Sequence, residues 1–64
     1  MNDTSHQTLK PEQLAERWET STATLANMRY LGSGPDYLKI GAAVRYPLAS
    51  IEAYEAANTV QVQR

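Results

Sequence analysis

The sequence contains no cysteine, so no disulfide can staple the fold, and a secreted miniprotein is not expected. At 64 residues the chain holds one small domain, which buries only about 60% of its unfolded surface. No apolar run approaches the roughly 20 residues that cross a bilayer, and the polar first seven residues lack the features of a signal peptide. These absences predict a soluble cytoplasmic protein with no membrane partner.

Residues that bind metals or perform covalent catalysis are equally scarce. His6 is the single histidine and stands in a polar segment. Without a second histidine or a cysteine there is no ligand cluster and no thiol nucleophile. The three acidic residues Glu12, Glu16 and Glu19 line a short predicted helix, and solvating it is a simpler role for them than acid–base catalysis. We therefore expect no cofactor, no metal and no enzymatic activity.

The formal net charge of −1 does not by itself favour a nucleic-acid partner, because Lys and Arg supply most non-specific affinity for DNA. The distribution of charge along the chain changes this interpretation. Residues 1–19 sum to −2 and residues 48–64 to −1. Residues 20–47 sum to +2, because Asp36 is their one acidic residue. A basic segment in the middle of the chain favours an anionic partner.

The first half of the chain predicts two short helices. Residues 1–8 show no periodicity and are expected to form a flexible tail, with order beginning near Leu9. Pro11 suits a first helical turn because its missing N–H would be unpaired there, so the first helix runs from Pro11 to Trp18. Its apolar stripe consists of Leu14, Ala15 and Trp18.

The second helix is predicted from Thr22 to Leu31, with Ser21 as the N-cap. Leu25 and Met28, three residues apart, mark its buried side. The opposite side and its edges are small and mostly polar, and they consist of Thr22, Ala23, Ala26, Asn27, Arg29 and Tyr30. Two short helices joined by a tight turn match the helix-turn-helix layout.

After Gly32–Pro35 the apolar period changes from helical to alternating, which predicts a β-hairpin whose apolar face covers the helices. Its apolar residues are Leu38, Ile40, Val44 and Tyr46, the last with its hydroxyl at the edge of the core. A turn centred on Ala42 places Lys39 across from Arg45 on the outer face, which makes sense mainly if an anion lies nearby. A two-residue turn, the alternative register, separates this pair.

Pro47 leads into a third helix, predicted over residues 48–57, with Glu52 and Glu55 turned outward. Residues 9–58 thus form the domain, and residues 59–64 are expected to be a flexible tail. The predicted fold is mainly α with a small β-hairpin. The residues assigned to its core are Trp18, Leu25, Met28, Ile51 and Tyr54.

This order of elements, with the segments LKPEQLAERW, GSGPDYLKIG, VRY and IEAY, resembles the excisionase and MerR-type winged helix-turn-helix family. The resemblance runs from about Leu9 to Ala57, and GPxYxKxG followed by VRY is its most specific part. It implies a recognition helix in the major groove and a hairpin wing at the flanking minor groove or backbone. The residues expected to contact DNA are Ser21, Thr22, Ala23, Ala26, Asn27, Arg29, Tyr30, Lys39, Ala42, Ala43 and Arg45.

The family implies a phage recombination directionality factor, which binds double-stranded DNA, bends it and directs a phage integrase toward excision. The chain departs from the family pattern at three places. The turn between its first two helices is Glu19–Thr20, its second helix carries fewer arginines than family members often have, and its wing tip is Ala42–Ala43. These departures predict weak binding by one copy, hence cooperative binding by neighbouring copies. We expect a monomer in free solution, because no predicted apolar stripe is left for a dimer helix.

Two other functions fit the same pattern. A small phage or bacterial transcription regulator would use the same surface. A protein-interaction module that kept the fold and lost DNA affinity is suggested by the missing arginines and the acidic total. Salt-dependent binding to duplex DNA separates this module from the other two functions.

Overall fold

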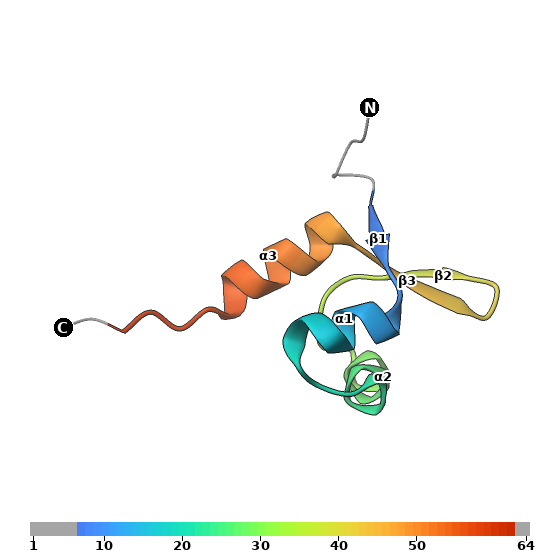
Figure 1. The fold of residues 1–64 in the computed structure, drawn as a ribbon, viewed down its shortest axis with the longest axis horizontal. Coiled ribbons are helices and arrows are strands. Elements are labelled where there is room, and N and C mark those ends of the chain that lie inside the picture. Colours follow the sequence, from blue (N-terminus) through green and yellow to red (C-terminus); the bar gives the residue numbers. More distant parts are fainter. Residues whose placement is uncertain (1–6, 63–64) are drawn as a thin grey trace.

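The computed structural model describes residues 7–62, and its elements follow the predicted order with one added strand (Figure 1). In chain order the elements are β1 (Thr8–Leu9), α1 (Pro11–Trp18), α2 (Thr22–Leu31), β2 (Leu38–Ile40), β3 (Ala43–Pro47) and α3 (Leu48–Asn58). The chain is therefore mainly α with a small antiparallel sheet, as predicted. Helices α1 and α2 have the predicted bounds, and α3 is one residue longer. Residues 1–6, His6 included, and residues 63–64 lie outside the described residues.

Local capping explains where the first two helices begin and end. The Oγ of Ser21 accepts a hydrogen bond from the backbone N–H of Thr24 at 3.1 Å, which confirms Ser21 as the N-cap of α2. Gly32 ends the same helix with φ of +74°, a left-handed conformation that glycine adopts without strain. Glu19 ends α1 and also takes a left-handed conformation, with φ of +55°. The chain thus turns sharply between α1 and α2.

Strand β3 is the middle strand of the sheet and pairs antiparallel with both β1 and β2. Sequence analysis placed Thr8 in the tail, but Thr8 pairs with Pro47, and Leu9 pairs with Tyr46. A two-residue strand is too short to produce an alternating pattern, so β1 left no signal in the sequence. Strand β3 also contacts α1 and α3, while α1 contacts α2 and β1. Strand β3 and helix α1 are therefore the centre of the fold.

The core is small and lies between α1, α2, α3 and the inner face of β3. Its buried residues are Leu14, Ala15, Leu25, Tyr46 and Ile51. The predictions for Leu25 and Ile51 are confirmed. Trp18 and Met28 are only partly buried against this core, and Trp18 stacks on Tyr54 with ring centroids 5.5 Å apart. Trp18 and Met28 therefore lie at the margin of the core and do not fill its centre.

The hairpin has the two-residue turn that was the alternative register. Lys39 pairs with Val44, and the turn consists of Gly41 and Ala42. Gly41 has φ of +60°, which suits the first position of a tight hairpin turn and which other residues adopt at a cost. The prediction that Lys39 lies directly across from Arg45 is therefore wrong.

The shift of one residue exchanges the two faces of β2, because successive side chains of a strand point to opposite sides. Tyr46 is buried and Val44 packs against the core, so this face of the hairpin is the inner one. Leu38 and Ile40 consequently lie on the outer face together with Arg45, and both are exposed. The prediction that the apolar residues of β2 cover the helices is wrong.

Glu55 connects α3 to α1, whereas the sequence predicted that it faces outward. Its carboxylate accepts hydrogen bonds from Nε and Nη2 of Arg17 at 2.7 and 2.8 Å and from Nε1 of Trp18 at 2.6 Å. The Arg17 bonds, followed by the Trp18 bond, lower the pKa of Glu55 from 4.5 to about 2. This ion pair joins residues 38 positions apart in the sequence, so helical periodicity could not indicate it.

Replacing Leu25 by alanine tests the core. Leu25 is 1% exposed, so Leu25→Ala is expected to lower the free energy of unfolding by about 2–5 kcal/mol. That is a large share of the ~5–15 kcal/mol typical of a folded domain. The matched control is Leu31→Ala in the same helix, where the side chain is 66% exposed and the expected change is about 0.5 kcal/mol or less. Equal losses for the two variants, measured by urea unfolding, would contradict this assignment.

Acid unfolding tests the Glu55 contact. The pKa of Glu55 is lower in the folded state than its ordinary value of 4.5, so its ionised carboxylate stabilises the fold fully above pH 4.5. This stabilisation disappears as the pH falls toward about 2. Glu55→Gln is therefore expected to be less stable than the parent at pH 6, and this difference should shrink steadily between pH 4.5 and 2. Glu52→Gln, an exposed change on the same helix, serves as the control. A difference between parent and Glu55→Gln that is independent of pH would refute the ion pair.

Candidate functional site

Helix α2 presents an outer face that carries no acidic side chain. Of the six positions predicted on this side and its edges, Arg29 is partly buried and the other five are exposed, and these are Thr22, Ala23, Ala26, Asn27 and Tyr30. Tyr30 is the most prominent, with 87% of its surface exposed. Leu25 on the opposite side is buried in the core, which fixes the rotation of the helix about its own axis. The predicted contact residues of α2 therefore lie on one continuous stripe at the surface.

Ser21, also predicted to contact DNA, has a structural task in this protein. Its hydroxyl oxygen accepts from the backbone N–H of Thr24 and lies 3.0 Å from the Oγ1 of Thr24. These contacts fix the first turn of α2. Ser21 is nevertheless exposed at the N-terminal end of α2.

Arg29 lies at the edge of this stripe and connects α2 to the sheet. Its Nη1 donates to the Oη of Tyr46 at 2.6 Å. Its guanidinium also lies 5.8 Å from the ring centroid of Tyr37 and 6.0 Å from that of Tyr46, within the range of cation–π attraction. A guanidinium carries five N–H donors, so the bond to Tyr46 uses one of them. Arg29 thus anchors α2, in addition to the DNA contact predicted from the sequence.

The hairpin carries the other predicted contact residues. Lys39 is exposed on β2, and the turn residue Ala42 is exposed at the tip, while Ala43 is partly buried. Arg45 is partly buried, and its Nη1 donates to the backbone carbonyl of Val44 at 2.8 Å. Because Lys39 pairs with Val44 on the inner side of the ribbon, Lys39 and Arg45 lie on opposite faces. The hairpin therefore carries one cation on each face.

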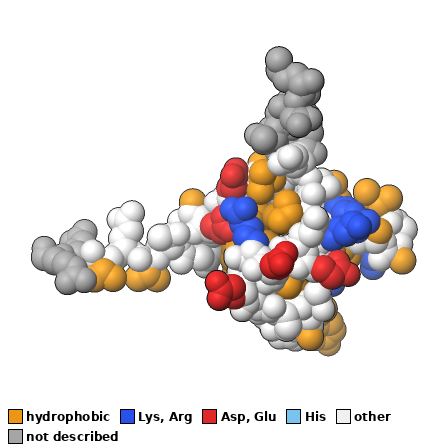
Figure 2. Space-filling model, in the orientation of Figure 1, with side chains coloured by type: hydrophobic (Ala, Val, Ile, Leu, Met, Phe, Trp, Pro, Cys, Tyr) orange, Lys and Arg blue, Asp and Glu red, His pale blue; other side chains and the backbone are white. Residues whose placement is uncertain are grey.

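Acidic side chains are concentrated on other elements. Glu12 and Glu16 on α1, Glu19 at its end and Glu52 on α3 are exposed, whereas α2, β2 and β3 contain no Asp or Glu. In Figure 2 red acidic groups lie around one basic group near the middle of the view, and a second basic group lies toward the hairpin. The surface formed by α1 and α3 is therefore richer in negative charge than the surface formed by α2 and the hairpin.

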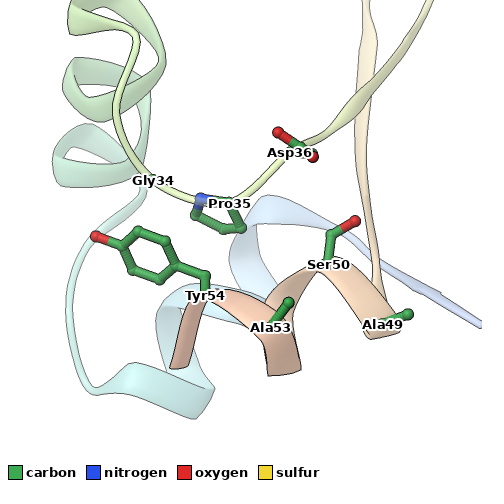
Figure 3. A pocket seen from close by; sticks show the side chains of 7 residues that line it. All are labelled: Gly34, Pro35, Asp36, Ala49, Ser50, Ala53 and Tyr54. Carbon is green, nitrogen blue, oxygen red and sulfur yellow. The ribbon is translucent and has the colours of Figure 1, made fainter. Parts of the chain in front are cut away.

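An open pocket of about 380 Å³ lies between the α2–β2 loop and α3 (Figure 3). It is lined by Gly34, Pro35, Asp36, Ala49, Ser50, Ala53 and Tyr54. In Figure 3 Asp36 and Ser50 lie on one side of Pro35, and Tyr54 lies on the other. The lining contains one carboxylate, one aliphatic hydroxyl and neither histidine nor cysteine. This composition favours a groove between packed elements over a reaction centre.

Two surface features were missed by reasoning from the sequence. Tyr37 stacks on Tyr46 with ring centroids 6.0 Å apart and lies under the guanidinium of Arg29. The sequence signal that could have indicated this role of Tyr37 was its position directly before the alternating segment of β2. Large apolar side chains also remain exposed at Leu31, Leu38 and Ile40. The expectation of a monomer in free solution considered only a stripe for a dimer helix and did not take these side chains into account.

Within residues 7–62 no group of three or more His, Cys, Asp or Glu side chains is placed to hold a metal ion. None of the helices in this range is long and apolar enough to cross a bilayer. In comparisons with known proteins, no protein-family model and no curated protein matches the chain. A functional assignment for this chain therefore rests on its sequence and on the geometry described above.

Proposed function

We propose that this protein is a winged helix-turn-helix that binds double-stranded DNA and acts as an excisionase. The observation that carries the proposal is the distribution of charge: the exposed face of α2 and the hairpin are free of acidic residues, whereas α1 and α3 carry exposed glutamates. Duplex DNA is a dense line of negative charge, so it approaches the α2 side. Helix α2 then serves as the recognition helix and the hairpin as the wing.

The outer stripe of α2 has side chains suited to the major groove, which is about 12 Å wide and admits a helix. Asn27 can pair with the N6 and N7 edge of adenine, and Ala23 or Thr22 can contact the methyl group of thymine. Ala26 adds little bulk, so the helix can approach the base edges closely. Ser21 contributes by holding the first turn of α2, where these residues begin.

The wing contributes contacts that carry no sequence information. Lys39 and Arg45 lie on opposite faces of a narrow ribbon, so a wing that enters a groove offers one cation to each flanking phosphate strand. The small residues Gly41 and Ala42 in the turn, with Ala43 directly after them, leave room for this approach. Arg29 stabilises the junction between α2 and β3 through Tyr46 and adds positive charge beside the recognition helix.

The role in excision comes from the family resemblance and from a shortage of cations. Three basic residues neutralise only a few phosphates, so one copy binds weakly at physiological salt. Bending tens of base pairs costs on the order of 1–6 kcal/mol, which neighbouring copies must share. We therefore propose cooperative loading of several copies, which bend the DNA and direct a phage integrase toward excision.

A protein-interaction module is the second candidate, and the apolar surface favours it. Tyr30 and Leu31 are both more than half exposed on α2 and could dock on a protein partner. A transcription regulator would use the same DNA-binding surface as an excisionase, without the need for bending.

The salt dependence of binding tests the DNA contact. Arg45→Ala should weaken binding to all duplexes about equally and reduce the slope of log K against log salt by about 0.9, because one phosphate contact is lost. Lys39→Ala should behave alike. Glu52→Gln on α3 changes the charge by one unit in the opposite direction and should leave the slope unchanged. An unaltered slope for Arg45→Ala would disprove the wing contact, and an absence of salt-dependent binding by the parent would favour the interaction module.

Binding to arrays of sites tests the excisionase role. The protein should bind two or three adjacent sites more tightly per site than one, and circular-permutation gels should detect a bend that grows with the number of copies. In the control DNA, the spacing between the same sites is lengthened by half a helical turn. Neighbouring copies then lie on opposite faces of the duplex. Tight binding to one isolated site without a bend would leave the transcription regulator as the better account.

A further inference from the structure

Strand β2 leaves one edge of the sheet open. The strand order is β1-β3-β2, so among the described residues β3 is the one strand that pairs with β2. An open edge presents backbone N–H and C=O groups that can pair with another chain. Beside this edge, Leu38 and Ile40 are 47% and 64% exposed on the outer face of the hairpin. The edge therefore has free backbone groups and two apolar side chains at alternate positions.

The segment that follows α3 has the residue pattern of a β-strand, but it pairs with no strand among the described residues. Val60 and Val62 alternate with Gln61, and the two valines are 85% and 76% exposed. Thr59, where α3 ends, already has extended backbone angles, with φ of −73° and ψ of 124°. β-Branched residues at alternate positions favour a strand with one apolar face. The apolar side chains of this segment thus stand at alternate positions, as those of β2 do.

The two features lie at opposite ends of the molecule. In Figure 1 the segment after α3 points to one end of the longest axis, and the β2–β3 hairpin projects at the other. Helix α3 begins directly after β3 and carries the chain about 16 Å away over its 11 residues. Val62 stands four residues beyond the helix, which spans at most about 14 Å. The segment is therefore too short to return to β2 of its own chain.

We propose that the segment Thr59–Val62 of one copy adds as a strand to the open edge of β2 in a second copy, with Val60 and Val62 beside Leu38 and Ile40. Addition of a strand to an open sheet edge is a common mode of recognition, in which backbone bonds supply affinity and alternate side chains supply specificity. Donor and acceptor lie at opposite ends, so each copy can bind two neighbours in a row.

Lys39 decides between this arrangement and the pairing of two β2 strands. Antiparallel pairing of two β2 strands about their centres would place Lys39 of one copy opposite Lys39 of the other, and directly opposed like charges are destabilising. Residues 59–62 carry no charge and avoid this repulsion. Lysine on an edge strand also limits indiscriminate pairing, so the contact is weak in free solution. The contact involves no DNA and does not rest on the proposed function.

The test measures self-association of the full chain without DNA, by sedimentation up to about 1 mM, the weak range suited to one short strand pair. The parent should pass beyond dimer with rising concentration, and the amide signals of residues 38–40 and 60–62 should shift together in NMR spectra. Val62→Lys should be monomeric. Gln61→Lys adds the same charge on the other face of the segment and should still associate. Ile40→Lys, with an intact segment and a defective edge, should be monomeric.

Mixing the two defective variants gives the decisive signature. Val62→Lys keeps the edge of β2 and Ile40→Lys keeps the terminal segment, so a mixture should form a dimer and stop there. A parent that stays monomeric at about 1 mM would overturn the proposal. Association that Val62→Lys does not weaken, or a mixture that stays monomeric, would overturn it equally. Circular dichroism of each variant establishes that it is folded.

Discussion

Tyr46 is 1% exposed in the middle strand of the sheet, and its hydroxyl accepts a hydrogen bond from Arg29 on α2. Burial of this side chain fixes which face of β3 is the inner one, and the pairing with β2 then determines the placement of every residue in the hairpin. Leu38 and Ile40 lie outside, and Lys39 and Arg45 lie on opposite faces of the ribbon. The arrangement of cations in the proposed wing is thus a consequence of packing one aromatic side chain.

Local signals in the sequence were sufficient for the helices. Pro11 at a first helical position, Ser21 as an N-cap and Gly32 in a left-handed conformation each act within a few residues, so the sequence predicted the bounds of α1 and α2. The exposed stripe of α2 followed from the same periodicity, because Leu25 marks the buried side. The residues of this stripe could therefore be identified without the structure, although their binding to DNA remains a proposal.

The parts that the sequence could not predict depend on contacts between distant residues or on a choice between close alternatives. Glu55 lies on α3, but its hydrogen bonds go to Arg17 and Trp18 on α1, and helical spacing contains no information about such a contact. The hairpin register depended on whether the turn had two or three residues, and Gly41 is compatible with the shorter one. A difference of one residue exchanged the faces of β2, and it exposed the apolar edge.

The central claim is that a polyanion meets α2 and the hairpin and avoids α1 and α3. It is tested most directly by titrating the labelled protein with duplex DNA at low salt and following backbone amide signals by NMR. We expect the shifts to concentrate on Ala23, Asn27, Lys39 and Arg45, with the signals of Glu52 on α3 unchanged. Shifts concentrated on α1 and α3, or no shift at any residue on saturation with DNA, would contradict the claim.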